Sequence, residues 1–262
     1  MVSLTFGYST LANRLSNISL PDLSSHPDWD VLITVQSGNQ SAPKEEDLAK
    51  APKGERVEVL AFPGVGVTKL RNQVLQNAKG KYLIFSDDDI LFDEQGLVEA
   101  IAYLETSGAG LLLGQAVDES GKLRKAYPSQ VQRLNKFNSA KAATYEMIVD
   151  LEQVRSAGVL FAENFGAGAE ITYLGDEYIF ICDLISAGVR CEFVPIVLAT
   201  HPTVSSGSGW GTDRDRIARA RIFDRAFKGN RTLPFMARVA FGLKKLGKGL
   251  TLGTYIRFIF KR

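Results

Sequence analysis

Short hydrophobic segments alternate with segments of helical periodicity along most of the chain. The hydrophobic segments are residues 2–7, 30–35, 57–62, 82–85 and 111–114. Leu70, Val74 and Ala78 share one helix face, and residues 95–105 form a further helix. Residues 82–85 are hydrophobic throughout, as expected of a strand buried on both faces of a parallel sheet. The alternation predicts an α/β fold in which helices flank a mostly parallel central sheet and ligands bind at the carboxyl ends of its strands.

The periodic pattern is interrupted once and then resumes. Between residues 115 and 143, glycine, proline and polar residues predict loops that face the site. Beyond them the pattern predicts a strand at 145–149, a helix at 176–187 and a strand at 190–194. We therefore expect one α/β domain over residues 1–224, a length that supports a substantial core.

The remaining segment, residues 225–262, has a different composition. It contains ten lysines and arginines and no acidic residue, whereas residues 1–224 carry 21 basic and 29 acidic residues, a net charge of −8. Apolar residues recur at helical spacing from Met236 to Leu246, and aromatic residues follow at 255–260. A basic amphipathic C-terminal helical tail of this kind is typical of a segment that lies on an anionic membrane surface. The alternative is a C-terminal helix docked on its own domain or on a partner subunit.

Charge, cysteines and hydropathy limit the partners and the compartment. The acidic domain argues against nucleic acid as a partner. Cys182 and Cys191 lie in apolar surroundings without metal-ligand spacing, which predicts buried free thiols in a reducing compartment. Residues 1–8 lack the features of a secretory signal, and no apolar stretch reaches about 18 residues. We expect a cytoplasmic protein, peripheral at the inner face of the membrane through its tail.

Three consecutive carboxylates follow the buried strand at 82–85. Asp87, Asp88 and Asp89 lie where parallel sheets bind ligands. Neighbouring carboxylates repel each other by roughly 1 kcal/mol per pair even in water, so a cation stabilises them. Mg²⁺ and Mn²⁺ bind one or two carboxylates and complete their shells with phosphate oxygens and water. The triplet predicts a metal site that holds a diphosphate; the alternative is a solvated acidic turn that caps the next helix.

Two segments, the second of which ends in this triplet, resemble the family-2 glycosyltransferases, which have the GT-A fold. The resemblance rests on a glycine-led loop and an Arg-Asn pair within Gly64–Asn72, and on an Ala-x-Gly, an apolar strand and an Asp-x-Asp within Ala78–Asp89. It implies a nucleoside diphosphate sugar as donor. Asp87 and Asp89 would then contact the metal and the donor phosphates, and Asp88 would lie close to the nucleotide ribose.

The resemblance extends to the donor pocket, with departures at its nucleobase end. It implies that Lys69 and Arg71 face the donor, and an arginine near the start of a helix can make a charge-assisted hydrogen bond to phosphate. Members of the family usually open with Pro-x-Tyr-Asn and place an aspartate after the second strand. Here Tyr8 lies in the first of these places and Gln36 and Asn39 lie in the second. We expect Tyr8 on the donor side and a hydrogen bond to the nucleobase from Gln36 or Asn39.

A second resembling region supplies the acceptor side and the base. Phe161–Gly168 matches a Phe-x-Glu-x-Phe-Gly-x-Gly pattern of the family. The residues that it implies at the acceptor are Asn164, Phe165 and Gly166. An inverting transfer needs a base, because the acceptor hydroxyl loses its proton as the new bond forms. The family places that base last in a Gly-Glu-Asp, where this chain has Gly-Asp-Glu, so the match selects Glu177. Asp176 is the alternative base and the expected N-cap of the following helix.

A histidine and a glycine-rich loop follow the last predicted strand. His201 stands where the family often has a histidine, and a neutral imidazole can complete a Mn²⁺ or Mg²⁺ shell or bind the leaving diphosphate. The alternative is a structural histidine. Residues 205–212 have the composition of a lid, in which Trp210 could cover the acceptor sugar or serve as a packing anchor.

These features together predict a metal-dependent, inverting hexosyltransferase. With Mn²⁺ or Mg²⁺ it would move a hexose from a nucleoside diphosphate sugar to a hydroxyl of a glycan or lipid-linked acceptor, in cell-surface polysaccharide synthesis. A nucleotidyltransferase is one alternative, but residues 7–10 do not supply the glycine-rich basic phosphate loop that it requires. A non-catalytic glycan-binding or scaffold protein is another, and the joint presence of Asp87, Asp89, Glu177 and His201 argues against it.

Overall fold

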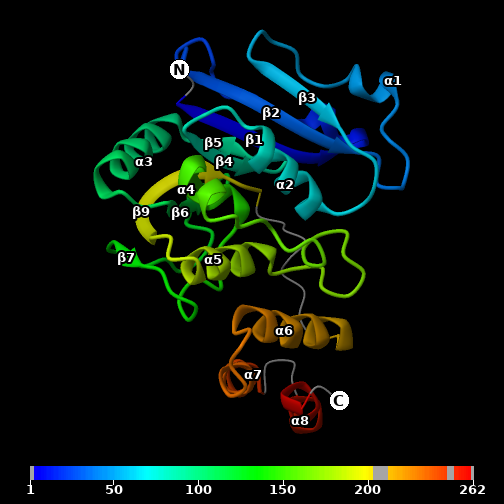
Figure 1. Ribbon diagram of the computed structural model, residues 1–262, viewed down its shortest axis with the longest axis vertical. Helices are drawn as coiled ribbons and strands as arrows, with labels where there is room; N and C mark the ends of the chain where they lie inside the picture. Colours follow the sequence, from blue (N-terminus) through cyan, green and yellow to red (C-terminus); the bar gives the residue numbers. More distant parts are fainter. Residues whose placement is uncertain (1–2, 203–211, 247–250, 261–262) are drawn as a thin grey trace.

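The computed structural model of the protein describes residues 3–202, 212–246 and 251–260. The strands are β1 (Leu4–Leu11), β2 (Trp29–Gln36), β3 (Val57–Ala61), β4 (Tyr82–Ser86), β5 (Leu91–Phe92), β6 (Leu111–Val117), β7 (Gln132–Arg133), β8 (Met147–Asp150) and β9 (Cys191–Thr200). The helices are η1 (Ala12–Asn17), α1 (Glu45–Leu48), α2 (Val67–Asn77), α3 (Glu94–Ser107), η2 (Thr144–Glu146), α4 (Leu151–Ser156), α5 (Asp176–Ser186), α6 (Asp213–Ala226), α7 (Leu233–Lys245) and α8 (Leu252–Phe260). Figure 1 shows the strands gathered in one sheet, with α6, α7 and α8 below it on the far side of α5.

The sheet follows the order β3-β2-β1-β4-β8-β6-β9-β5, and β7 pairs with β9. Strands β1 to β4 are parallel, as are β6 and β9, while β8 runs antiparallel between β4 and β6. This confirms the α/β fold with a mostly parallel sheet. The parallel strands β1, β2 and β4 end at a common edge, where the acidic triplet follows β4.

Alternate residues of the strands supply two separate hydrophobic cores. In β4, Tyr82 and Ile84 point to the core under α3 and η1, whereas Leu83 and Phe85 point to the core under α2, α4 and α5. The residues of β4 are all buried, which confirms its assignment as a strand covered on both faces. The two cores fix both sides of the β4 terminus, so the carboxylates that follow it are held in position.

Two strands, β1 and β9, extend furthest beyond the ends that the sequence pattern predicts. The first runs to Leu11 and leads into the 3₁₀ helix η1, so the expected amphipathic helix after residue 7 does not form. The last continues through Pro195 to Thr200. Proline lacks the N–H that a ladder needs, and the pairing of β6 with β9 shifts register between Leu113 and Gln115, opposite this proline. The extension brings residue 201 to the same sheet edge as the acidic triplet.

The C-terminal helices dock on one another and on the domain. Arg238 is buried, pairs with Asp224 at 2.6 Å and donates to the carbonyl oxygen of Ile259 at 2.9 Å. The rings of Phe235 and Phe260 meet with their centroids 5.9 Å apart, so α7 and α8 form an antiparallel hairpin. Arg238 therefore points into the hairpin, and its charge is not part of a basic outer face. The structure places residue 224, the expected domain boundary, within α6.

Two smaller expectations concern cysteines and membrane spans. Cys182 and Cys191 are free and buried, as the sequence predicts. Within the described ranges, none of the helices is long and apolar enough to cross a membrane.

Candidate functional site

A cavity of about 580 Å³ lies at the carboxyl edge of β1, β2 and β4. The segment 167–177, which leads into α5, closes it from the opposite side. Its charged lining residues are Arg14, Arg71, Asp87, Asp88, Asp89, Asp176 and Glu177. With every carboxylate ionised, the cavity carries three negative charges more than positive ones. It therefore attracts cations, and an anionic ligand needs a cation to bind there.

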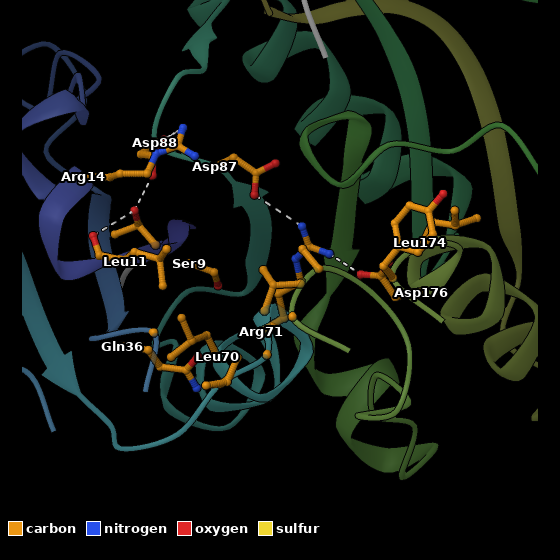
Figure 2. Close-up of a pocket in the computed structure, with 18 of the residues that line it drawn as sticks. Ser9, Leu11, Arg14, Gln36, Leu70, Arg71, Asp87, Asp88, Leu174 and Asp176 are labelled. Atoms are coloured by element: carbon orange, nitrogen blue, oxygen red, sulfur yellow. Dashed lines mark hydrogen bonds and ion pairs between the residues drawn. The ribbon is translucent and has the colours of Figure 1, made fainter. Parts of the chain in front are cut away.

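Arg71 joins the two sides of this cavity. The side chain is 6% exposed, and its guanidinium forms an ion pair with Asp176 and lies 3.3 Å from Asp87 and 3.7 Å from Glu177. Figure 2 shows Arg71 between Asp87 and Asp176, with a dashed line to each. Burial alone would lower the pKa of Arg71, but the charges of Asp176, Asp87 and Glu177 raise it above its usual value. The arginine thus stays charged and holds the β4 terminus against α5.

Asp88 is the most buried member of the triplet. One of its carboxylate oxygens accepts a hydrogen bond from the hydroxyl of Thr10, and the other forms an ion pair with Arg14. Burial raises the pKa of Asp88, against the opposing effects of the Thr10 hydrogen bond and the Arg14 charge. Asp87 and Asp89 are different, with side chains 37% and 38% exposed at the cavity. The three carboxylates therefore face different partners.

Asp176 and Glu177 begin α5 but differ in environment. Gly175 is the N-cap and no side chain caps the helix, so the expected capping role of Asp176 is wrong, because its carboxylate pairs with Arg71 instead. Glu177 lines the cavity and accepts a hydrogen bond from Thr144 at 2.9 Å. Burial, and then the charge of Asp176, raises the pKa of Glu177 well above the usual range of a glutamate. Such a carboxyl group can hold or accept a proton near neutral pH.

Gly166 and Asn72 hold the segment that leads into α5 in place. Gly166 has φ +90°, and a Cβ at this position would lie 2.7 Å from the Asp176 carboxylate. Asn72 accepts a hydrogen bond from the Phe161 N–H at 2.8 Å and donates to the Phe161 carbonyl oxygen at 3.0 Å. The Arg-Asn pair on α2 thus fixes this segment twice, once through charge and once through backbone hydrogen bonds. Gly166 lies against the Asp176 carboxylate and does not itself line the cavity.

His201 lies at the edge of the cavity, at the end of β9. Its ring stacks on Tyr145 with centroids 4.8 Å apart, and Nδ1 lies 2.6 Å from the carbonyl oxygen of Pro202. Because a carbonyl oxygen only accepts hydrogen bonds, Nδ1 carries the proton in this contact and Nε2 of a neutral imidazole keeps its lone pair.

Several residues that the sequence placed at the site lie away from the cavity. Tyr8 is fully buried in the core and donates to the Ser19 carbonyl oxygen at 2.9 Å, because β1 continues beyond it. Asn39 binds its own loop, where its side chain accepts from the Ser41 N–H at 2.8 Å. Gln36, in contrast, is buried and lines the cavity.

The remaining expected residues are placed as follows. The side chains of Lys69 and Asn164 are exposed, and neither residue lines the cavity. Phe165 packs in a third hydrophobic cluster with α5 and α6. Trp210 lies outside the described residues.

Sequence reasoning missed several residues of the cavity. Ser9, Thr10 and Leu11 line it because β1 is longer than its apolar run, and Arg14 and Tyr173 line it as well. The high strand propensity of Tyr8 and Thr10 was a signal that the strand continued. Arg14 carried no such signal, since a basic residue in a surface turn is ordinary.

Comparisons with known proteins identify the family and the fold. Residues 11–156, more than half of the chain, match the model of glycosyl transferase family 2. The crystal structure of S. aureus TarS 1–349 in complex with UDP is similar at a TM-score of 0.58 and 13% identity, with 98% of this chain and 81% of that chain covered. The structure of the same protein in complex with UDP-GlcNAc gives 0.50 and 15%, covering 99% and 82%.

A longer TarS structure gives a TM-score of 0.57 at 13% identity, covering 94% of this chain, which spans 43% of that one. No curated protein matches the chain in sequence. The structural likeness, at these identities, shows a GT-A-like fold. The family model covers η1 through α4, including Arg71 and the acidic triplet. The molecule is therefore a glycosyltransferase, and the chain belongs to glycosyl transferase family 2.

Proposed function

We propose that this glycosyltransferase moves a hexose from a uridine diphosphate sugar to a hydroxyl of a glycan or lipid-linked acceptor, with inversion and with a divalent cation, Mn²⁺ or Mg²⁺. The observation that carries the proposal is the position of Arg71, which holds the carboxylates of the donor edge and of α5 around one cavity. The TarS complexes with UDP and with UDP-GlcNAc support the choice of nucleotide. Cell-surface polysaccharide synthesis is the process that we infer for such an acceptor.

The donor half of the cavity suits a divalent cation shared with a diphosphate. Asp87 and Asp89 present hard carboxylate oxygens at its surface, and His201, at the edge of the same cavity, is the third proposed ligand. In the part of the chain that the structure describes, no three acidic, histidine or cysteine side chains are clustered for a metal. A cation held here therefore needs the phosphates to complete its shell. When bound, it supplies positive charge where the leaving diphosphate gains negative charge.

The residues of the chain supply the remaining parts of the transfer. Gln36 and Asp88 line the cavity and are the proposed contacts to the nucleoside, and Arg71 is the residue that we propose to stabilise charge on the diphosphate. Glu177, with its raised pKa and its Thr144 hydrogen bond, takes the proton of the acceptor hydroxyl as the oxygen bonds to the anomeric carbon. Asp176, paired with Arg71, positions Glu177 and does not compete as the base.

Release of UDP from UDP-sugars in the presence of Mn²⁺ tests the proposed reaction. The wild-type protein should release UDP with one donor sugar, and release should increase when a suitable glycan acceptor is added. Glu177→Gln should lower the rate by roughly 10²–10⁴-fold, the usual contribution of a positioned base. Glu170→Gln, which changes an exposed carboxylate on the same segment, is the control and should keep the rate. Wild-type protein that releases no UDP from any donor, or a Glu177→Gln variant with full activity, would contradict the assignment.

We also propose that the α7–α8 hairpin lies on an anionic membrane surface. Its outer face carries an apolar stripe, whose members are Phe235, Met236, Leu243, Leu246, Leu252, Ile256 and Phe260. Each of these side chains is at least 38% exposed. Exposed basic residues border the stripe at Arg231, Lys244 and Arg257, and the segment beyond Asp224 has no acid to oppose them. Apolar and basic groups together suit the headgroup region of anionic lipid.

Sedimentation with vesicles tests this surface. The protein should bind phosphatidylglycerol vesicles, bind phosphatidylcholine vesicles less, and lose binding at high salt because the charge attraction is screened. Met236→Glu should weaken binding, whereas Val98→Glu, at an exposed apolar position of α3, should not. Equal binding by wild type and Met236→Glu would contradict the proposal, as would a stripe that instead forms a dimer.

A further inference from the structure

Arg14 is the second cationic side chain of the cavity, and it is more exposed and less tightly held than Arg71. It lies on η1, directly after β1, with 47% of its side chain exposed. The guanidinium contacts Oδ1 of Asp88 and lies 3.7 Å from Oδ2 of Asp89. Figure 2 shows Arg14 turned toward Asp88 at the opposite side of the cavity from Arg71. A long, half-exposed side chain can leave such a position, whereas buried Arg71 is held by carboxylates on both sides.

Asp88 is left incompletely satisfied by this contact. Its Oδ2 accepts a hydrogen bond from Thr10, but Oδ1 is buried and accepts none from the described residues. The ion pair with Arg14 therefore supplies charge without the geometry of a hydrogen bond. Buried acceptors in native proteins nearly always have a partner, and an exception marks a place that a ligand or water fills.

Arg14 also lies where it opposes a metal and favours an anion. A positive guanidinium 3.7 Å from Asp89 repels any cation that approaches this carboxylate. Once a cation is bound, the attraction of the triplet for Arg14 is reduced, and the nearest remaining negative charge is the diphosphate of the donor. An arginine binds phosphate oxygens with two parallel hydrogen bonds, which a diphosphate offers and a nucleoside does not.

We propose that Arg14 is a donor-binding residue that serves as an internal counter-ion. In the free protein it neutralises Asp88 and Asp89, and in the donor complex it turns to the diphosphate. This inference rests on the proposed function and adds to it a residue that contacts the donor phosphates. It gives Arg14 effects of opposite sign on two ligands, because the same charge weakens the binding of a metal alone and strengthens the binding of a metal–diphosphate pair.

Binding measurements on Arg14→Gln test both effects without an activity assay. Mn²⁺ affinity in the absence of nucleotide is measured by electron paramagnetic resonance, and the affinities for UDP and uridine at saturating Mn²⁺ by calorimetry. Arg14→Gln should bind Mn²⁺ alone several-fold more tightly and UDP roughly tenfold more weakly, since a charge-assisted hydrogen bond to phosphate is lost. Uridine affinity should not fall. Arg14→Lys should bind UDP with intermediate affinity because it keeps the charge but loses the paired hydrogen bonds.

The controls separate this role from others. Arg221→Gln removes an exposed arginine on α6 and should change none of the three affinities. Unchanged Mn²⁺ affinity in Arg14→Gln would refute the counter-ion role, and equal losses for UDP and uridine would assign Arg14 to the nucleoside instead of the diphosphate. Wild-type protein that binds neither Mn²⁺ nor UDP would overturn the proposed function and this inference with it. An unchanged melting temperature shows that Arg14→Gln is folded.

Discussion

Replacing Arg71 by leucine removes the cation that Asp87, Asp176 and Glu177 share. Asp176 is 3% exposed, and its carboxylate lies against Gly166 and the Arg71 guanidinium, where water cannot replace the lost charge. Removal of one partner of a buried ion pair costs about 3–5 kcal/mol. Domains of this kind unfold with a free energy of about 5–15 kcal/mol, so Arg71→Leu should lose a large part of the total.

A double-mutant cycle separates the ion pair from the packing of Arg71. The variants are Arg71→Leu, Asp176→Asn and the double variant, each unfolded with guanidinium chloride and followed by tryptophan fluorescence. The double variant should be less destabilised than the sum of the single ones by at least about 1 kcal/mol, since residues in one buried network couple by 0.5–3 kcal/mol. Glu177 and Asp87 keep some repulsion in the double variant, so it should not recover wild-type stability.

An exposed ion pair provides the matched control. Lys79 and Glu58 lie 2.6 Å apart with side chains 65% and 45% exposed. Lys79→Leu should therefore cost less than about 1 kcal/mol. Costs for Arg71→Leu as small as this, or strictly additive effects in the cycle, would refute the argument that Arg71 holds the two sides of the cavity together.

Three further outcomes follow from the site. The pKa of Glu177 is raised from 4.5 to about 8, so the folded protein holds this proton more tightly than the unfolded chain. The stability that the protonated form provides is lost as pH rises through the folded-state pKa. Glu177→Gln should therefore be more stable than wild type above pH 8. A stability difference between variant and wild type that is equal at pH 5 and pH 9 in denaturation curves would contradict this. Gly166→Ala should be strained at φ +90° and should displace the Asp176 carboxylate, lowering both the melting temperature and the transfer rate. Asn72→Ala leaves the Phe161 N–H without its partner and should cost about 1–3 kcal/mol in unfolding free energy, whereas a melting temperature equal to wild type would show that water replaces the bond.

The sheet and the edge that carries the site followed from the sequence. Hydrophobic strands and helical periodicity gave the α/β fold, and the position of Asp87, Asp88 and Asp89 after a buried strand placed them at the ligand edge. Both signals are local, because a period of two or of 3.6 and a strand terminus are visible within a few residues. The structure also brings Arg71 to the same cavity, since a helix start after a glycine loop faces that edge.

The contacts that the site residues make with one another could not be predicted from the sequence. The pairing of Arg71 with Asp176 joins residues far apart in the chain. The sequence around Arg71 is the same whether the arginine binds a carboxylate of the protein or a phosphate of the ligand. Tyr8 was placed at the site because the end of β1 was set four residues too early, and each residue of a strand shifts the edge by about 3.3 Å. The docked hairpin of α7 and α8 was only one of two alternatives, because an amphipathic helix has the same pattern on a membrane and on its own domain.

The most direct test of the account is the affinity of UDP with and without a divalent cation. Calorimetry with the wild-type protein in Mn²⁺ and in EDTA measures it, together with Asp89→Asn, a nearly isosteric change at a partly exposed side chain. The account predicts that UDP binds in Mn²⁺ and that its affinity falls at least tenfold in EDTA and in Asp89→Asn, because the net negative cavity then repels the diphosphate. Equal UDP affinity with and without the cation, or unchanged affinity in Asp89→Asn, would contradict it.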